Sequence, residues 1–112
     1  MDLRIAKAIQ LVEADLSKCY TERWLADSTG MTREHFGRLF KRETGESPMS
    51  FLRRLRFEEA RRILESGEHL NLTIKEISNK VGVHDASHFV REFQVRFGYS
   101  PARYRQVKNS TK

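Results

Sequence analysis

Hydrophobic residues recur at three- and four-residue intervals through most of the chain, with charged and polar residues between them. This spacing places apolar side chains on one face of an α-helix, so it predicts a succession of amphipathic helices. The first is expected from Leu3 to Leu16, and Thr21 can cap a short second one. In that second helix we expect Trp24 and Leu25 to point inward and Ala26 to permit close packing.

A glycine turn and a capping residue introduce the third helix. Gly30 supplies the positive φ that a tight turn needs, and Thr32 can cap a helix that begins at Arg33 and ends at Gly45. Because a helix advances about 100° per residue, its apolar and polar side chains separate onto opposite faces. The apolar face consists of Phe36, Leu39 and Phe40, and the polar, mostly basic face of Glu34, Arg38 and Lys41.

Two Ser-Pro pairs each predict the start of a helix, because serine caps and proline suits the first helical position. The helix after Ser47 is expected from Pro48 to about Ser66 and would span roughly 28 Å. Ser100 and Pro101 open a last short helix, and the polar tail from Val107 to Lys112 is expected to fray. The apolar positions of the long helix are Phe51, Leu52, Leu55, Ala60, Ile63 and Leu64.

The region between these pairs carries another glycine turn. Thr73 and Glu76 have the spacing of a capping box and open a short helix. Gly82 makes the turn, and Asp85 caps the helix that follows. In that helix Phe89, Phe93 and Phe97 are expected inside, and Ser87, His88 and Arg91 outside.

The two halves therefore repeat one pattern: a short helix, a glycine turn, a longer helix, then Gly-x-Ser-Pro. One inserted residue in the second turn shifts the register. The pattern is typical of a helix-turn-helix, in which the first helix braces the second and the second presents its outward side chains to a DNA major groove. Two units joined by a stiff helix of roughly 28 Å would suit successive major-groove faces, which lie about 34 Å apart. The repeat pairs His35, Phe36, Arg38 and Phe40 with His88, Phe89, Arg91 and Phe93.

Charge and length narrow the class of protein. The chain has 112 residues, enough for one domain or two small helical lobes. Its 21 Lys and Arg residues against 15 Asp and Glu give a net charge of +6, which favours a polyanionic partner.

The single Cys19 excludes an internal disulfide and fits a reducing compartment. With no apolar run long enough for a bilayer and no signal-peptide core, a soluble cytoplasmic protein without membrane contact is expected.

The motif LAxxxGMTxxHFxRLFKxxxGxSPxxFLxxLRxxxA, followed by IxxISxxxGVxxxSHFxREFxxxFGxSPxxYR, resembles the DNA-binding domain of the AraC/XylS family of bacterial transcription regulators. The resemblance runs from about Ile5 to Arg105. It implies an all-α fold of seven helices over residues 1–112, with two homeodomain-like helix-turn-helix lobes at about 3–46 and 70–106 and a linker helix at about 48–66. It also implies sequence-specific binding of double-stranded DNA at the bacterial nucleoid, with one recognition helix in each of two adjacent major grooves.

The resemblance further implies transcription activation through RNA polymerase. The sequence has no Ser-His-Asp arrangement with supporting motif, no glycine-rich phosphate loop and no paired carboxylates in an apolar setting, so no enzymatic activity and no cofactor are expected. Many members also carry an effector-binding or dimerisation domain, and this chain contains none. Either it is a C-terminal domain cut from a longer protein, or it is a naturally short regulator. The alternative function is a basic helical protein-interaction module that docks an acidic partner.

The base-reading residues are carried over from the family by position, whereas the phosphate contacts and the turn and cap residues follow from the residue types themselves. Gly37 falls where members often have a side chain able to reach a base, so that position is expected to read little. Val83 replaces the phenylalanine common after the second turn glycine. The base-reading positions are Glu34, Gly37 and Arg38 in the first reading helix and Ala86, Ser87, His88 and Arg91 in the second; the phosphate contacts are Thr32, Arg33, Lys41, Arg42 and Arg96; the turn and cap residues are Gly30, Gly82, Asp85, Pro48 and Pro101.

Each candidate has a purely structural alternative. Arg38 can hold guanine O6 and N7 in a bidentate fork, or pair with Glu34 one turn earlier. Glu34 can accept from cytosine N4, or stabilise the helix dipole from the first turn. Arg91 has the acidic neighbours Asp85 and Glu92. His84 and His88 have the spacing of a metal pair, but no third ligand lies nearby, so no metal site is expected.

Overall fold

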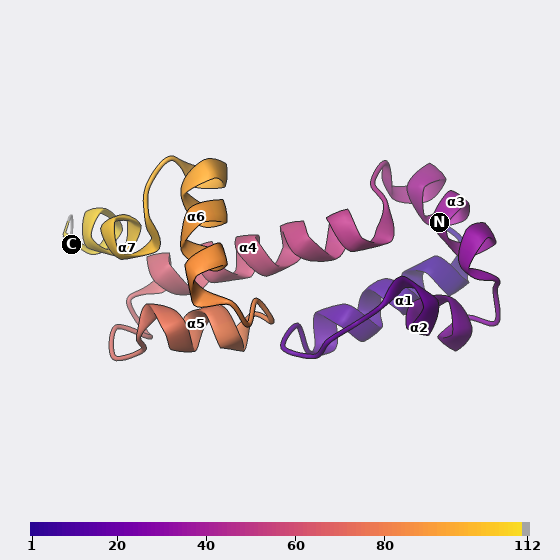
Figure 1. The fold of residues 1–112 in the computed structure, drawn as a ribbon, viewed down its shortest axis with the longest axis horizontal. Coiled ribbons are helices and arrows are strands. Elements are labelled where there is room, and N and C mark those ends of the chain that lie inside the picture. Colours follow the sequence, from indigo (N-terminus) through magenta and orange to yellow (C-terminus); the bar gives the residue numbers. More distant parts are fainter. Residues whose placement is uncertain (111–112) are drawn as a thin grey trace. The chain divides into compact units, whose positions relative to one another are not determined.

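The described part of the chain, residues 1–110 of this computed structural model, is folded into seven α-helices and contains no strand. This confirms the predicted all-α fold. The helices are α1 (Leu3–Ala14), α2 (Glu22–Ser28), α3 (Arg33–Thr44), α4 (Pro48–Ser66), α5 (Ile74–Lys80), α6 (Ala86–Phe97) and α7 (Pro101–Asn109) (Figure 1). None of these described helices combines the length and apolar character that crossing a membrane requires.

Local sequence signals set the helix ends. The side chains of Thr21, Thr32, Asp85 and Ser100 each accept a hydrogen bond from a backbone N–H in the first turn of α2, α3, α6 and α7. Thr73 and Glu76 form the predicted capping box, with each side chain bonded to the other residue's backbone N–H. The predicted caps of α2, α3, α5, α6 and α7 are therefore confirmed.

The chain divides into two compact units, Met1–Leu55 and the part from Arg56 onward. In the first unit, α2 and α1 both pack against α3. Phe36 is fully buried there, and the ring of Phe40 meets that of Phe51 edge-on at 5.2 Å. The core residues of the first unit are Ile5, Ala8, Val12, Leu25, Ala26, Met31, Phe36, Leu39, Phe40 and Leu52.

The core of the second unit forms around Phe57, which is fully buried. Its ring stacks on that of Phe89 at 5.3 Å with an interplanar angle of 13°. Helix α6 packs against both α5 and α7. The core residues are Phe57, Ala60, Ile63, Leu64, Ile77, Val81, Val83, Phe89, Phe93 and Tyr104. Helix α4 thus contributes apolar side chains to both cores, Leu52 to the first and four residues to the second.

The structure corrects the expected orientation of Trp24, whose surface is 49% exposed. Helix α2 has only seven residues, and Leu25 and Ala26 occupy its buried face. The indole lies against the ring of Tyr20 instead, with 5.6 Å between centroids. The expectation that Trp24 belongs to the core was therefore wrong.

Two helix ends also differ from expectation. Helix α1 ends at Ala14 rather than Leu16, because Asp15 adopts an extended backbone. Helix α7 continues through Val107 to Asn109, where a frayed tail was expected. The amide of Asn109 donates to the carbonyl oxygen of Leu64 at 3.0 Å, which fixes this last turn against α4. Thr111 and Lys112 of the expected tail lie outside the described residues.

Candidate nucleic-acid interface

Helix α3 separates its side chains as its sequence predicts. Phe36, Leu39 and Phe40 are buried, and they anchor the helix in the first unit. The opposite face exposes Glu34, Arg38, Lys41 and Arg42, and Thr32 and Arg33 at its start are exposed as well. The hydroxyl of Thr32 accepts from the backbone N–H of His35 at 3.2 Å, so it is already engaged as the cap.

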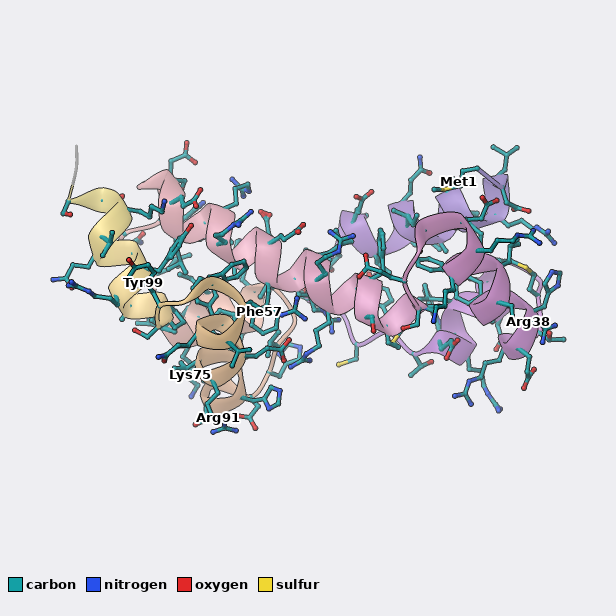
Figure 2. The ribbon with its side chains drawn as sticks, turned by 90° about the horizontal axis from the view of Figure 1, so that it is seen from above. Met1, Arg38, Phe57, Lys75, Arg91 and Tyr99 are labelled. Carbon is teal, nitrogen blue, oxygen red and sulfur yellow. The ribbon has the colours of Figure 1, made fainter. Side chains whose placement is uncertain are left out.

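Arg38 is the accessible cation at the middle of this face. It projects away from α3 (Figure 2) and, within the described residues, makes no hydrogen bond or close ion pair. Glu34 does not pair with it, although the two are four residues apart. An open hollow of about 420 Å³ lies beside it, lined by His35, Arg38, Leu39 and Arg42. A guanidinium with these surroundings is available to an external acceptor.

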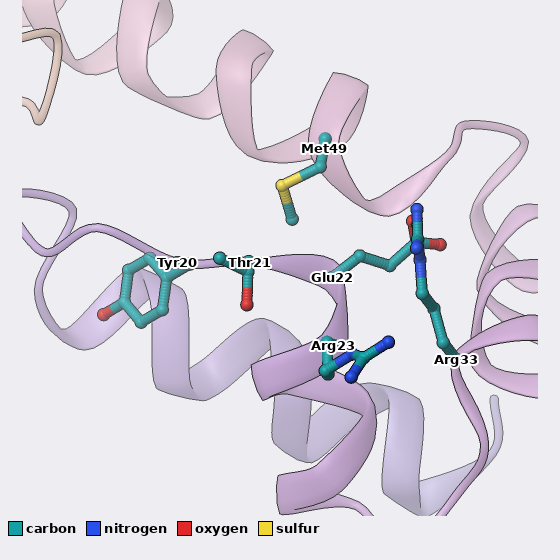
Figure 3. A pocket seen from close by; sticks show the side chains of 6 residues that line it. All are labelled: Tyr20, Thr21, Glu22, Arg23, Arg33 and Met49. Atoms are coloured by element: carbon teal, nitrogen blue, oxygen red, sulfur yellow. The ribbon is translucent and has the colours of Figure 1, made fainter.

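Gly37 lies on the flank of α3 that faces α2. The carboxylate of Glu22, the first residue of α2, approaches so closely that a Cβ added to Gly37 would lie 2.7 Å from Glu22 Oε1. The other carboxylate oxygen lies 3.5 Å from Nε of Arg33 (Figure 3). Arg33, an expected phosphate contact, is therefore paired within the first unit, with its side chain still 58% exposed.

Helix α6 is the equivalent element of the second unit. The backbone N–H of His88 donates to the Asp85 carboxylate at 3.0 Å, and this bond lowers the pKa of Asp85. Ser87, His88 and Arg91 are exposed, and Ala86 is half-buried. Arg91 projects away from α6 (Figure 2). The expected outward residues of this helix thus share an accessible face.

Glu92 organises the side chains behind that face. It accepts from Nε of Arg96 at 2.9 Å and lies 3.3 Å from Nε2 of His88. The Arg96 guanidinium also lies over the Phe57 ring, 5.0 Å from its centroid. Arg96, an expected phosphate contact, is thereby tied into the second unit. Glu92 thus contacts both His88 and Arg96.

The turns before α3 and α6 both contain a glycine but differ in how they are stabilised. Gly30 and Gly82 have φ of 75° and 89°, in the left-handed region that favours glycine. In the second turn the buried hydroxyl of Ser78 donates to the carbonyl oxygen of Val83, a contact the sequence analysis did not anticipate. In the repeat, Ser78 corresponds to Ala26. A small polar residue at a core position is the sequence feature from which this hydrogen bond could have been predicted.

Metal-ligating side chains do not gather in groups of three or more within the described residues. Nδ1 of His84 lies 3.3 Å from the side-chain oxygen of Asn79. Nε2 of His88 lies 3.3 Å from Oε1 of Glu92.

Comparison with known proteins agrees with this geometry. Residues 25–107 match the family model described as a helix-turn-helix domain. AlkR, an HTH-type transcriptional regulator of Acinetobacter baylyi, is 32% identical over 95% of this chain and 34% of its own length. The DNA-binding domain of AdpA, solved in complex with a target DNA, superposes with a TM-score of 0.89 at 25% identity over 97% of this chain and 96% of that one.

The chain belongs to the AraC-type helix-turn-helix family. A probable AraC family regulator from Rhodopseudomonas palustris has the same fold, with a TM-score of 0.80 at 25% identity over 96% of this chain and 98% of that one. The resemblance seen in the sequence is confirmed. AraC-type proteins are transcription regulators rather than enzymes, as expected. The chain spans about a third of the length of AlkR.

Proposed function

We propose that this AraC-type domain binds double-stranded DNA sequence-specifically and regulates bacterial transcription at the nucleoid, with α3 and α6 each reading one of two adjacent major grooves. One observation carries the proposal. In both units a buried phenylalanine face anchors a twelve-residue helix and leaves an arginine, Arg38 or Arg91, exposed on the outer face. AdpA's domain, of the same fold, was solved with its target DNA.

The chemistry of the two faces suggests a division of roles. Arg38 and Arg91 can hold guanine O6 and N7 in bidentate fashion. Ser87 and His88 offer hydrogen bonds to base edges or phosphates, and Glu34 can accept one from cytosine N4. Lys41 and Arg42 in the last turn of α3 supply charge to phosphates, which raises affinity without selecting sequence. Arg33 and Arg96 reach phosphates only while keeping or exchanging their carboxylate partners.

The experiment compares two α3 cations of equal charge. Arg38→Ala should lose about 1–3 kcal/mol of binding free energy on the preferred site and relax the base preference there. Lys41→Ala should weaken binding to all duplexes by a similar factor and lower the salt slope. Titration of a panel of operator variants at fixed salt measures both. Equal weakening of every sequence by Arg38→Ala would show that Arg38 reads no base.

A competition experiment separates this proposal from docking of an acidic protein. A DNA reader prefers its selected site over random duplex, whereas a basic interaction module binds both equally weakly. Salt dependence alone does not discriminate, because both modes are electrostatic.

We also propose that DNA binding serves activation through RNA polymerase. Support comes from a similar protein, the lactose operon transcription activator of Staphylococcus xylosus, which is 32% identical over 90% of this chain and 35% of its own length. In vitro transcription from a promoter carrying the selected site tests this, because activation predicts more transcript with the protein than without it.

A further inference from the structure

The expected base-reading position at Gly37 is occupied by a side chain from another helix. Gly37 has no side chain of its own, and Oε1 of Glu22 lies only 2.7 Å from the point where a Cβ would stand. A carboxylate from α2 thus lies on the flank of the reading helix, where a residue-37 side chain would begin.

Glu22 is held in this place by its own element and by Arg33. Thr21 caps α2, so the first helical residue is Glu22 and its side chain leaves from the start of the helix. Nε of Arg33 lies 3.5 Å from Oε2 of Glu22. The Glu22 side chain remains 26% exposed, beside an open hollow of about 390 Å³ that Glu22 and Arg33 help to line (Figure 3). The carboxylate is accessible, and the guanidinium offsets its charge near phosphates.

The second unit has apolar residues at the corresponding positions. In the repeat, Glu22 corresponds to Ile74, Arg33 to Ala86 and Gly37 to Val90. Ile74 and Val90 pack against the second apolar core. Apolar packing at these places suffices for the fold of the second unit, so the fold alone does not call for a carboxylate in the first.

We propose that Glu22 is a specificity-determining residue, which replaces the missing side chain at Gly37 and reads a base that offers an amino group. A carboxylate only accepts hydrogen bonds. In the major groove cytosine N4 and adenine N6 are donors, whereas guanine and thymine offer acceptors that a carboxylate repels. Cytosine is favoured, because adenine also offers an acceptor at N7. This inference rests on the proposed function of α3 as a reading helix.

Two variants remove the carboxylate from this place by different means. Glu22→Gln keeps the shape but adds a donor and removes the charge. Gly37→Ala keeps the charge, but its Cβ would meet Glu22 Oε1 at 2.7 Å and displaces the carboxylate; alanine is the better helix former, so folding is retained. Asp27→Asn is the matched control, since it removes one negative charge from an exposed position of the same helix.

The measurement is binding to a duplex panel with every base at each position of the selected site. Glu22→Gln and Gly37→Ala are both expected to lose about tenfold discrimination at one and the same base pair. Asp27→Asn should keep the wild-type preferences. Unchanged base preferences in Glu22→Gln, or a uniform gain of affinity, overturn the role of Glu22. If the wild-type protein itself shows no preference, the proposed function fails instead.

Discussion

Trp24, the chain's single tryptophan, lies half exposed against Tyr20. Its fluorescence should therefore be quenched readily by acrylamide in the folded protein. Trp24→Ala should lower the free energy of unfolding by about 1 kcal/mol or less, because only one ring contact is lost. Phe36→Ala, the buried comparison, should cost about 3–5 kcal/mol. A native tryptophan shielded from quencher would contradict the exposed placement.

Tyr104 should make the stability depend on pH at the alkaline end. Burial, together with the hydrogen bond that its hydroxyl donates to Glu65, raises the pKa of Tyr104 to about 12. Below about pH 10 the phenol is protonated in both states, and between pH 10 and 12 only the unfolded chain loses the proton. Stability should fall by about 2–3 kcal/mol across that window.

The Tyr104→Phe variant isolates the contribution of the phenol, because it removes only the hydroxyl group. Urea unfolding of both proteins from pH 9 to 12 should give free energies of unfolding that converge as the pH rises. If the two free energies of unfolding instead change in parallel with pH, the Tyr104 hydroxyl is not protected from ionisation in the folded state.

Phe57 shows why residue-level prediction is incomplete. It stands between Arg56 and Glu58 in a highly charged stretch, so it is missing from the apolar positions predicted for the long helix. Phe36 and Phe89, in contrast, belong to clear apolar stripes and were predicted correctly. Which isolated aromatic residue enters a core depends on the partner helices that receive it, and the helical period alone does not contain that information.

At the scale of the elements, the ends of the helices depend on single hydrogen bonds. The capping box of α5 is an accessible case, because Thr73 is exposed and its hydroxyl accepts from the N–H of Glu76 at 3.0 Å. Thr73→Ala should lower the free energy of unfolding by about 1 kcal/mol, whereas Thr73→Ser keeps the cap and should cost much less. Urea unfolding of the two variants tests this, and an equal loss in both would contradict the capping role.

Elements were predicted better than residues because their signals are local. Caps, turn glycines and Ser-Pro pairs act within a few residues, and the caps of α3, α5 and α7 are in the expected places. The exceptions were set by contacts distant in sequence. Asn109, for example, extends α7 by bonding to Leu64, forty-five residues away. The Glu22 carboxylate beside Gly37 is also a contact between residues distant in sequence, and no motif predicts it.

At the scale of the whole molecule, the two cores share α4 but enclose different side chains. Phe57→Ala should remove about 3–5 kcal/mol from the second unit, because it leaves a cavity against Phe89. If the units unfold separately, hydrogen exchange should accelerate in α5 to α7 and remain slow in α1 to α3. Equal acceleration throughout would show that the chain unfolds as one cooperative body.

Selection of binding sites from a random duplex library tests the central claim, that the chain is a two-unit DNA reader with Arg38 and Arg91 as its base contacts. The wild-type protein should enrich two half-sites whose centres lie about one helical turn apart. Arg38→Ala should weaken the sequence preference at a base pair of one half-site and Arg91→Ala at a base pair of the other, with the larger loss of discrimination from Arg38→Ala. Absence of any enriched sequence, or loss of the same half-site in both variants, would contradict the account.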